Sequence, residues 1–137
     1  MSNDVSGHHH IVVLLVDDQM IIAETLRRML EDEKDMEYHY CSDPGKAVQT
    51  AAELAPSIIL QVLVMPGTDG ISLVSAYRSN PATKDVPVIV ISSEDDSSVK
   101  ARAFAAKADD YLVKLPDKIE LLARIRHHAE GYLNTLG

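Results

Sequence analysis

Residues 11–18 read IVVLLVDD, an apolar run that ends abruptly in two aspartates. A run that is apolar at every position is typical of a central strand in a parallel sheet, because both faces of such a strand are buried. Similar runs follow at 58–63, 88–91 and 111–113, and segments of helical periodicity separate them. This alternation predicts repeated strand–helix units.

Two further kinds of element complete the pattern. Residues 36–41 alternate between apolar and polar side chains, as in a half-exposed edge strand. Helices are expected at about 20–30, 44–54, 70–79, 97–106 and from 118 onward. Asp43 and Asp69 stand where they would cap the second and third of these helices. The sequence therefore predicts an α/β fold, a doubly wound (βα)₅ domain.

The amphipathic stripes of the later helices predict which side chains face the sheet. In the helix at 97–106 these are Val99, Ala103 and Phe104. In the closing helix they are Ile119, Leu122, Ile125 and Ala129.

The length and composition fit one globular domain. The chain has 137 residues, 46% of them hydrophobic, which is enough for one core. We expect a flexible tail at 1–10, which includes the tag-like His8–His10 tract, and a domain at 11–130. Residues 131–137 would be the end of the last helix or the start of a linker.

The charge and the cysteine content exclude several classes of partner. The net charge is −8, with 21 acidic and 13 basic side chains and no basic cluster, so neither nucleic acid nor an anionic membrane is an expected partner. The longest apolar run, 11–16, is far shorter than the roughly 20 residues of a membrane helix. The single cysteine, Cys41, is expected to be a buried hydrophobe, and the cytoplasm is the expected compartment.

The carboxyl ends of the strands should carry the functional site, because ligands of open α/β sheets bind there. The first strand ends in Asp17 and Asp18, the third delivers Val62, and the fourth and fifth deliver Ser92 and Lys114. Paired carboxylates suit Mg²⁺, and an ammonium and a hydroxyl suit phosphoryl oxygens. The expected nucleophile on the central strand is missing.

Four motifs together resemble the receiver domain of bacterial two-component response regulators: VVLLVDDQ, MPGTDG, VIVISS and DDYLVKLP. The resemblance covers about residues 11–129 and implies a flavodoxin-like, CheY-like sheet with strand order 2-1-3-4-5. Details such as YRSNPAT, AFAA and DYLVKLPDKIELLARIR are most similar to the receiver of WspR-type response regulators. In that type a diguanylate cyclase output domain follows the receiver, and this chain contains no such domain. The resemblance also implies a cognate histidine kinase or another phosphodonor as partner.

The resemblance implies roles at six positions. Asp18 would be the direct metal ligand, Asp17 its partner through water, the backbone carbonyl of Val64 a third ligand, Ser92 the hydroxyl switch, Tyr111 the aromatic that follows it, and Lys114 the phosphate contact.

The phosphoacceptor aspartate of the family falls on Val62. This residue is the sixth after Pro56 and the fourth before Pro66, which is the family's spacing. Valine has no nucleophilic oxygen, so aspartyl phosphorylation is excluded at this position. Gln61 should point to the opposite face of the strand, and Asp69 is better placed to cap the next helix, so neither neighbour substitutes for the missing aspartate.

The valine also changes the expected electrostatics. Without a third carboxylate, Mg²⁺ binding should be weak and the metal-free fold at least as stable as the aspartate form. Lys114 can still pair with the remaining acids. The chain departs from the family at Lys107, where glycine is usual, and at Lys114-Leu115-Pro116, where lysine usually precedes proline directly.

The sequence therefore predicts a phosphorylation-incompetent receiver, not an enzyme, which acts through protein contacts. The resemblance also implies a possible homodimer, which would form through a face made by 97–106, Tyr111 and 118–131. Two alternatives stay open, a natural pseudo-receiver for dimerisation or docking and an ordinary receiver in which Val62 is an introduced or variant residue. A third, a Mg²⁺-dependent phosphatase-like enzyme with Asp17 as nucleophile, lacks the second acid expected at Gln19.

Overall fold

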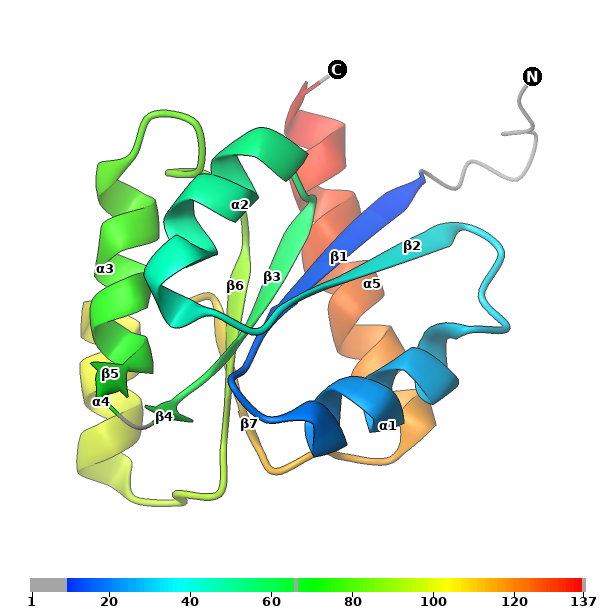
Figure 1. Cartoon of the computed structure of the whole chain (residues 1–137). Coiled ribbons are helices and arrows are strands. Elements are labelled where there is room, and N and C mark those ends of the chain that lie inside the picture. Colours follow the sequence, from blue (N-terminus) through cyan, green and yellow to red (C-terminus); the bar gives the residue numbers. More distant parts are fainter. Residues whose placement is uncertain (1–9, 66, 137) are drawn as a thin grey trace.

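The computed structural model describes residues 10–65 and 67–136, so most of the expected tail at 1–10, together with Pro66 and Gly137, lies outside the described residues (Figure 1). The first half of the chain forms β1 (Ile11–Val16), α1 (Met20–Leu30), β2 (Met36–Cys41), a 3₁₀ turn (Pro44–Lys46), α2 (Ala47–Leu54) and β3 (Ile58–Val62). The second half forms β4 (Val64–Met65), β5 (Thr68–Asp69), α3 (Gly70–Ser79), β6 (Val88–Ser92), α4 (Ser97–Ala105), β7 (Asp110–Val113) and α5 (Lys118–Leu136).

The main sheet has five parallel strands in the order β2-β1-β3-β6-β7, which confirms the predicted order 2-1-3-4-5. The register places Val16 opposite Gln61, and Val62 opposite Ile91. β2 lies at one edge, as its alternating pattern predicted. The carboxyl ends of β1, β3 and β6 consequently meet at the centre of one edge of the sheet.

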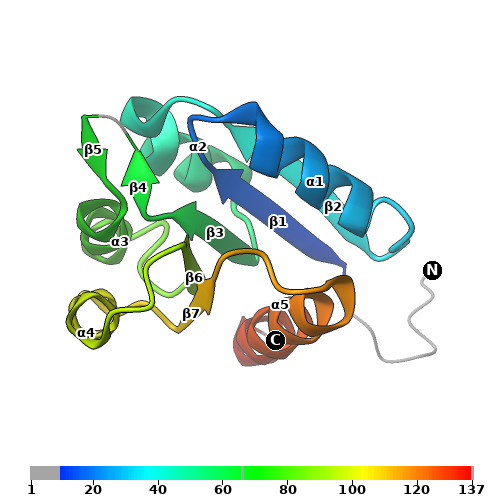
Figure 2. The same ribbon diagram turned by 90° about the horizontal axis from the view of Figure 1, so that it is seen from below.

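Each face of the sheet has its own hydrophobic core. Alternate residues of β1 divide between the two cores, with Val13 and Leu15 facing α1 and α5, and Leu14 and Val16 facing α2, α3 and α4. Figure 2 shows α1 and α5 on one side of the sheet and α3 and α4 on the other. This burial on both sides explains why the strands are apolar at every position.

Aspartates begin several of the helical segments. Asp43 accepts a hydrogen bond from the backbone N–H of Gly45, but it caps the 3₁₀ turn, and α2 starts only at Ala47. Asp69 accepts from the N–H of Ile71 and caps α3 as predicted. Such caps fix where each helix leaves the sheet edge.

Two predicted core positions are wrong. Ile119 is 82% exposed, and α5 instead buries Leu121, Ile125 and Ala129, which are spaced by four and share one face. Phe104 is 46% exposed because α4 turns only Ala103 fully toward the sheet, and adjacent helical residues point about 100° apart. Both errors arose because the apolar residues of each helix are compatible with more than one choice of buried face.

A short antiparallel ribbon follows β3, where the sequence indicated only a loop. Val64 pairs with Asp69 and Met65 with Thr68, and β3 itself ends at Val62. Gly67 has a φ of 74°, a left-handed conformation that glycine adopts readily in such a turn. The ribbon projects Val64, which is 68% exposed, from the carboxyl edge of the sheet.

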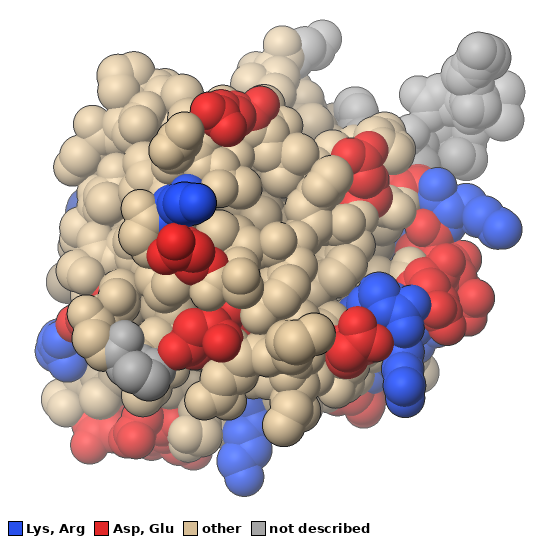
Figure 3. All heavy atoms as spheres, viewed as in Figure 1, with Lys and Arg blue, Asp and Glu red and all other residues tan. Residues whose placement is uncertain are grey.

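The surface agrees with the expectations from composition. On the face shown in Figure 3, basic side chains are scattered among acidic ones and do not form one patch. Cys41 is free and buried, as predicted. No helix within the described parts of the chain is long and apolar enough to span a membrane.

Candidate functional site

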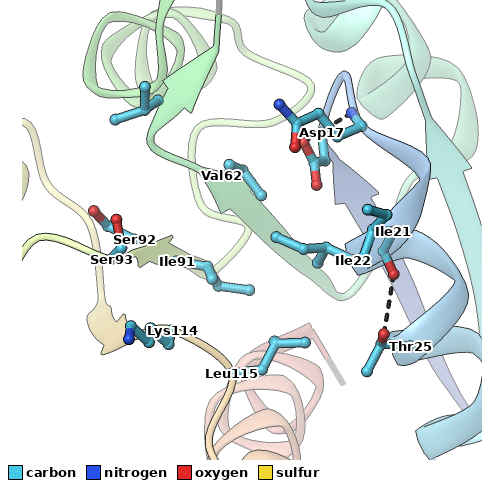
Figure 4. Close-up of a pocket in the computed structure, with 12 residues that line it drawn as sticks. Asp17, Ile21, Ile22, Thr25, Val62, Ile91, Ser92, Ser93, Lys114 and Leu115 are labelled. Carbon is cyan, nitrogen blue, oxygen red and sulfur yellow. Dashed lines mark hydrogen bonds between the residues drawn. The ribbon is translucent and has the colours of Figure 1, made fainter.

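A pocket of about 410 Å³ opens at the carboxyl edge of the sheet. It brings together five of the predicted site residues, Asp17, Val62, Val64, Ser92 and Lys114. Figure 4 shows Asp17 and Val62 on one part of the wall, with Ser92 and Lys114 across the pocket from Asp17. Asp18 and Tyr111, the other two predicted site residues, lie outside its lining.

Asp17 is the most deeply buried charged group of the site, with 1% of its surface exposed. One carboxylate oxygen accepts a 3.0 Å hydrogen bond from the N–H of Gln19, while the other, Oδ2, has no partner. Burial, and to a smaller extent the nearby charge of Asp18, raises the pKa of Asp17 above its usual range. A cation at Oδ2 would offset this desolvation.

Two further polar atoms near Asp17 are buried without partners, Asp18 Oδ1 and the hydroxyl of Tyr40. Burial and the charges of Asp17 and Asp18 raise the pKa of Tyr40. Two carboxylates with open oxygens match the one or two that a Mg²⁺ site takes from a protein. Within residues 10–65 and 67–136 no third His, Cys, Asp or Glu completes a metal cluster. The donors therefore fit a weakly held Mg²⁺ with most ligands supplied by water.

Val62 is part of the apolar core at the site. It is 8% exposed and belongs to the same cluster as Leu60, Ile89 and Ile91. The pocket wall therefore has the two methyl groups of Val62 at the position where a nucleophile would be expected.

Ser92 and Tyr111 both bind the backbone of Glu94, in the loop after β6. The hydroxyl of Ser92 accepts a 2.9 Å hydrogen bond from the N–H of Glu94, and the hydroxyl of Tyr111 donates a 2.7 Å bond to its carbonyl. The ammonium of Lys100 lies 5.9 Å from the centre of the Tyr111 ring. Tyr111 is buried, with 8% of its surface exposed. Its hydrogen bond to Glu94 ties the loop after β6 to β7.

Among the described residues, Lys114 makes no ion pair with Asp17 or Asp18, a pairing that the sequence allowed. It is exposed, and among the described residues no carboxylate lies within ion-pair distance of its ammonium. The residue has a left-handed backbone, with a φ of 59°, and its N–H donates to the carbonyl of Ser92. Its side chain lines the pocket. Lys107 also has a positive φ, of 80°.

The sequence did not reveal the hydrogen-bond partners of the Gln61 side chain. Gln61 is fully buried on the face opposite the pocket, as its place in the strand predicted. Its side-chain oxygen accepts a 2.6 Å hydrogen bond from the hydroxyl of Tyr77 in α3, and its amide donates to the carbonyl of Val62. A glutamine inside an apolar strand was the one available signal, because a buried amide needs partners.

Gly70 allows α3 to begin against the end of β3. A Cβ atom at this position would lie 2.4 Å from the carbonyl oxygen of Val62 and 2.8 Å from the Cα of Leu63. Any other residue would push α3 away from the strand, so the glycine fixes how the ribbon and the pocket wall meet.

Comparisons with known proteins place these features in a family. Residues 13–126 match the family model described as response regulator receiver domain. Over 102 residues the chain is 33% identical to the response regulator PleD of Caulobacter vibrioides. That match covers 72% of this chain and 22% of PleD, so the chain spans less than a quarter of this relative.

Solved structures show the same fold. The response regulator domain of Thermotoga maritima CheB has a TM-score of 0.76 and 27% identity, and the match covers 88% of this chain and 96% of that one. A receiver domain of a sensor histidine kinase from Pseudomonas aeruginosa PAO1, with magnesium coordinated in its active site cleft, has a TM-score of 0.78 and 22% identity. That match covers 88% of this chain and 98% of the other.

Proposed function

Because the chain belongs to the response regulator receiver domain family, we propose that it acts in phosphorelay signalling as a receiver that cannot itself be phosphorylated. The observation that carries the proposal is the position of Val62 in the pocket that also contains Asp17, Ser92 and Lys114. Valine offers no oxygen to attack a phosphorus atom. Gln61, the adjacent polar side chain, is committed to Tyr77 on the other face.

The remaining site residues would supply the chemistry that the resemblance implies around the missing aspartate. Asp17 and Asp18, with the backbone carbonyl of Val64, would hold Mg²⁺ weakly, and the open oxygens of both aspartates support this. Ser92 and Lys114 line the pocket opposite Asp17, where they could contact phosphoryl oxygens. Tyr111 would follow Ser92, and their shared bonds to one backbone residue support this coupling.

The output of such a receiver would pass through protein contacts. A homodimer face made by α4, β7 and α5 is supported by exposed apolar side chains on all three elements, Phe104, Val113 and Ile119. The WspR-type sequence details support a diguanylate cyclase output domain in a longer protein and a histidine kinase as the partner upstream.

A natural pseudo-receiver, which docks without any phosphorylation step, is the second candidate. The apolar packing of Val62 with Ile91 favours it, because both are components of one buried cluster. In that case Val62 would fix one conformation of the loop that follows Ser92.

Beryllofluoride, which mimics an aspartyl phosphate, tests the main proposal. With Mg²⁺ present, it should leave the amide NMR spectrum of this chain unchanged and shift the signals of Ser92 and Tyr111 in Val62→Asp. Val62→Asn, which has the size of aspartate without its charge, is the matched control and should not respond. Equal shifts in the unaltered chain would contradict the proposal.

A further inference from the structure

The pocket at the carboxyl edge differs in chemistry from a phosphoryl site, because most of its wall is apolar. Ile22 from α1, Val62 from β3, Ile91 from β6 and Leu115 from the segment after β7 all line it. Ile21, which is 78% exposed, extends the apolar surface to the rim. A volume of about 410 Å³ lies in the range of pockets that bind small organic molecules.

Two charged side chains line this pocket, Lys114 at its rim and Asp17 beside the apolar wall. Asp17 is 1% exposed, and its Oδ2 atom has no hydrogen-bond partner. Figure 4 shows its carboxylate directed into the space beside Val62 and Ile22. A buried acceptor without a partner costs free energy, which a ligand that donates to it would recover.

We propose that this pocket binds a small organic cation, an ammonium group carried on an apolar body. The ammonium would donate to Asp17 Oδ2, and the apolar body would lie against Val62, Ile91, Ile22 and Leu115. This inference goes beyond the proposed function and requires no phosphorylation.

The surrounding charge and the wall chemistry favour this ligand class. A net charge of −8 attracts cations to the molecule. Lys114 at the rim is exposed, so solvent and salt screen its repulsion. Hydrated Mg²⁺ at the same carboxylates would keep several waters, which apolar side chains cannot hydrogen-bond, so only an organic ligand would use the apolar wall.

Titration with benzylamine tests the proposal directly. Methyl NMR signals of Val62, Ile91 and Ile22 should shift together and saturate, with a common dissociation constant. Benzyl alcohol, which has a similar shape without the charge, should bind about tenfold or more weakly. In Asp17→Asn, which keeps the shape of the side chain, this preference for benzylamine should disappear while benzyl alcohol binds as before.

A second pair of variants tests the position of the ligand. Thr25 lines the pocket from α1, so Thr25→Phe should fill part of it and weaken benzylamine binding. Arg28→Phe adds the same ring to the same helix outside this pocket and should leave binding unchanged. Equal binding of the two probes, unsaturable shifts, or equal effects of the two phenylalanines would overturn the proposal. These outcomes are independent of whether beryllofluoride binds.

Discussion

The hydroxyl of Tyr77 donates a 2.6 Å hydrogen bond to the side-chain oxygen of Gln61, which joins α3 to the strand that carries Val62. Both side chains are fully buried. Burial raises the pKa of the Tyr77 phenol, so the hydroxyl stays protonated and remains a donor. The pair anchors the carboxyl end of β3 from the face opposite the pocket.

Loss of this hydrogen bond should destabilise the fold. Tyr77→Phe leaves the buried oxygen of Gln61 without a partner, and we expect the free energy of unfolding to fall by about 1–3 kcal/mol. Urea denaturation followed by circular dichroism measures the change. Tyr132→Phe, on the partly exposed part of α5, is the control and should have a much smaller effect. Equal losses in both variants would contradict this role of the bond.

Lys107 occupies a backbone conformation that suits glycine. Its φ of 80° is strained for a residue with a Cβ atom, so Lys107→Gly should raise the free energy of unfolding by about 0.5–1 kcal/mol. Lys107→Ala removes the same long side chain but keeps the Cβ atom, and it should bring no such gain. If alanine stabilises the chain as much as glycine, the side chain rather than the backbone is responsible.

Asp110 should make stability depend on pH. Burial alone would raise the pKa of its carboxyl group, but hydrogen bonds from His128, the N–H of Tyr111 and Arg124 together lower it below the usual 3.8. A carboxylate with a lowered pKa stabilises the fold only while it is ionised. Its contribution is therefore complete above pH 3.8 and is lost as pH falls through the lower value of the folded chain.

The corresponding experiment compares urea unfolding at pH 7 and pH 3. Asp110→Asn should reduce stability at pH 7 and lose less than the unaltered chain on acidification. Asp85→Asn, at an exposed aspartate before β6, should keep the pH dependence of the unaltered chain. An unchanged pH dependence in Asp110→Asn would refute the assignment.

The proposed dimer face can be tested by introducing one charged side chain into it. Phe104→Glu places a carboxylate on α4 at an exposed aromatic position and should raise the dimer dissociation constant at least about tenfold in sedimentation velocity. Met20→Glu makes a similar change at an exposed apolar residue of α1, outside the face, and should leave association unchanged. A monomeric unaltered chain, or equal effects of the two variants, would contradict the dimer proposal.

The fold could be predicted because its signals are local. The apolar run at 11–16, the alternation at 36–41 and the helix start at Lys118 appear in the structure with the expected bounds. Each depends on the pattern of neighbouring residues: a central strand buried on both faces is apolar throughout, and a half-exposed edge strand alternates. Ile119 was misplaced because its helix offers more than one apolar face.

The arrangement of the site could be predicted only in part, because side-chain partners depend on tertiary contacts. Strand ends brought Asp17, Val62 and Ser92 together as expected. No local pattern indicated that Ser92 would accept a hydrogen bond from Glu94 in the following loop, or that Lys114 would make no ion pair with the described residues. The apolar character of the pocket also arises from residues of separate elements.

Intact mass spectrometry tests the central claim most directly. This chain and Val62→Asp are incubated side by side with Mg²⁺ and a small-molecule phosphodonor. We predict that only Val62→Asp gains the mass of one phosphoryl group, which is then lost by hydrolysis. A phosphoryl group on the unaltered chain would contradict the claim that Val62 prevents phosphorylation, and a Val62→Asp variant that also fails to react would show that Val62 is not the only obstacle.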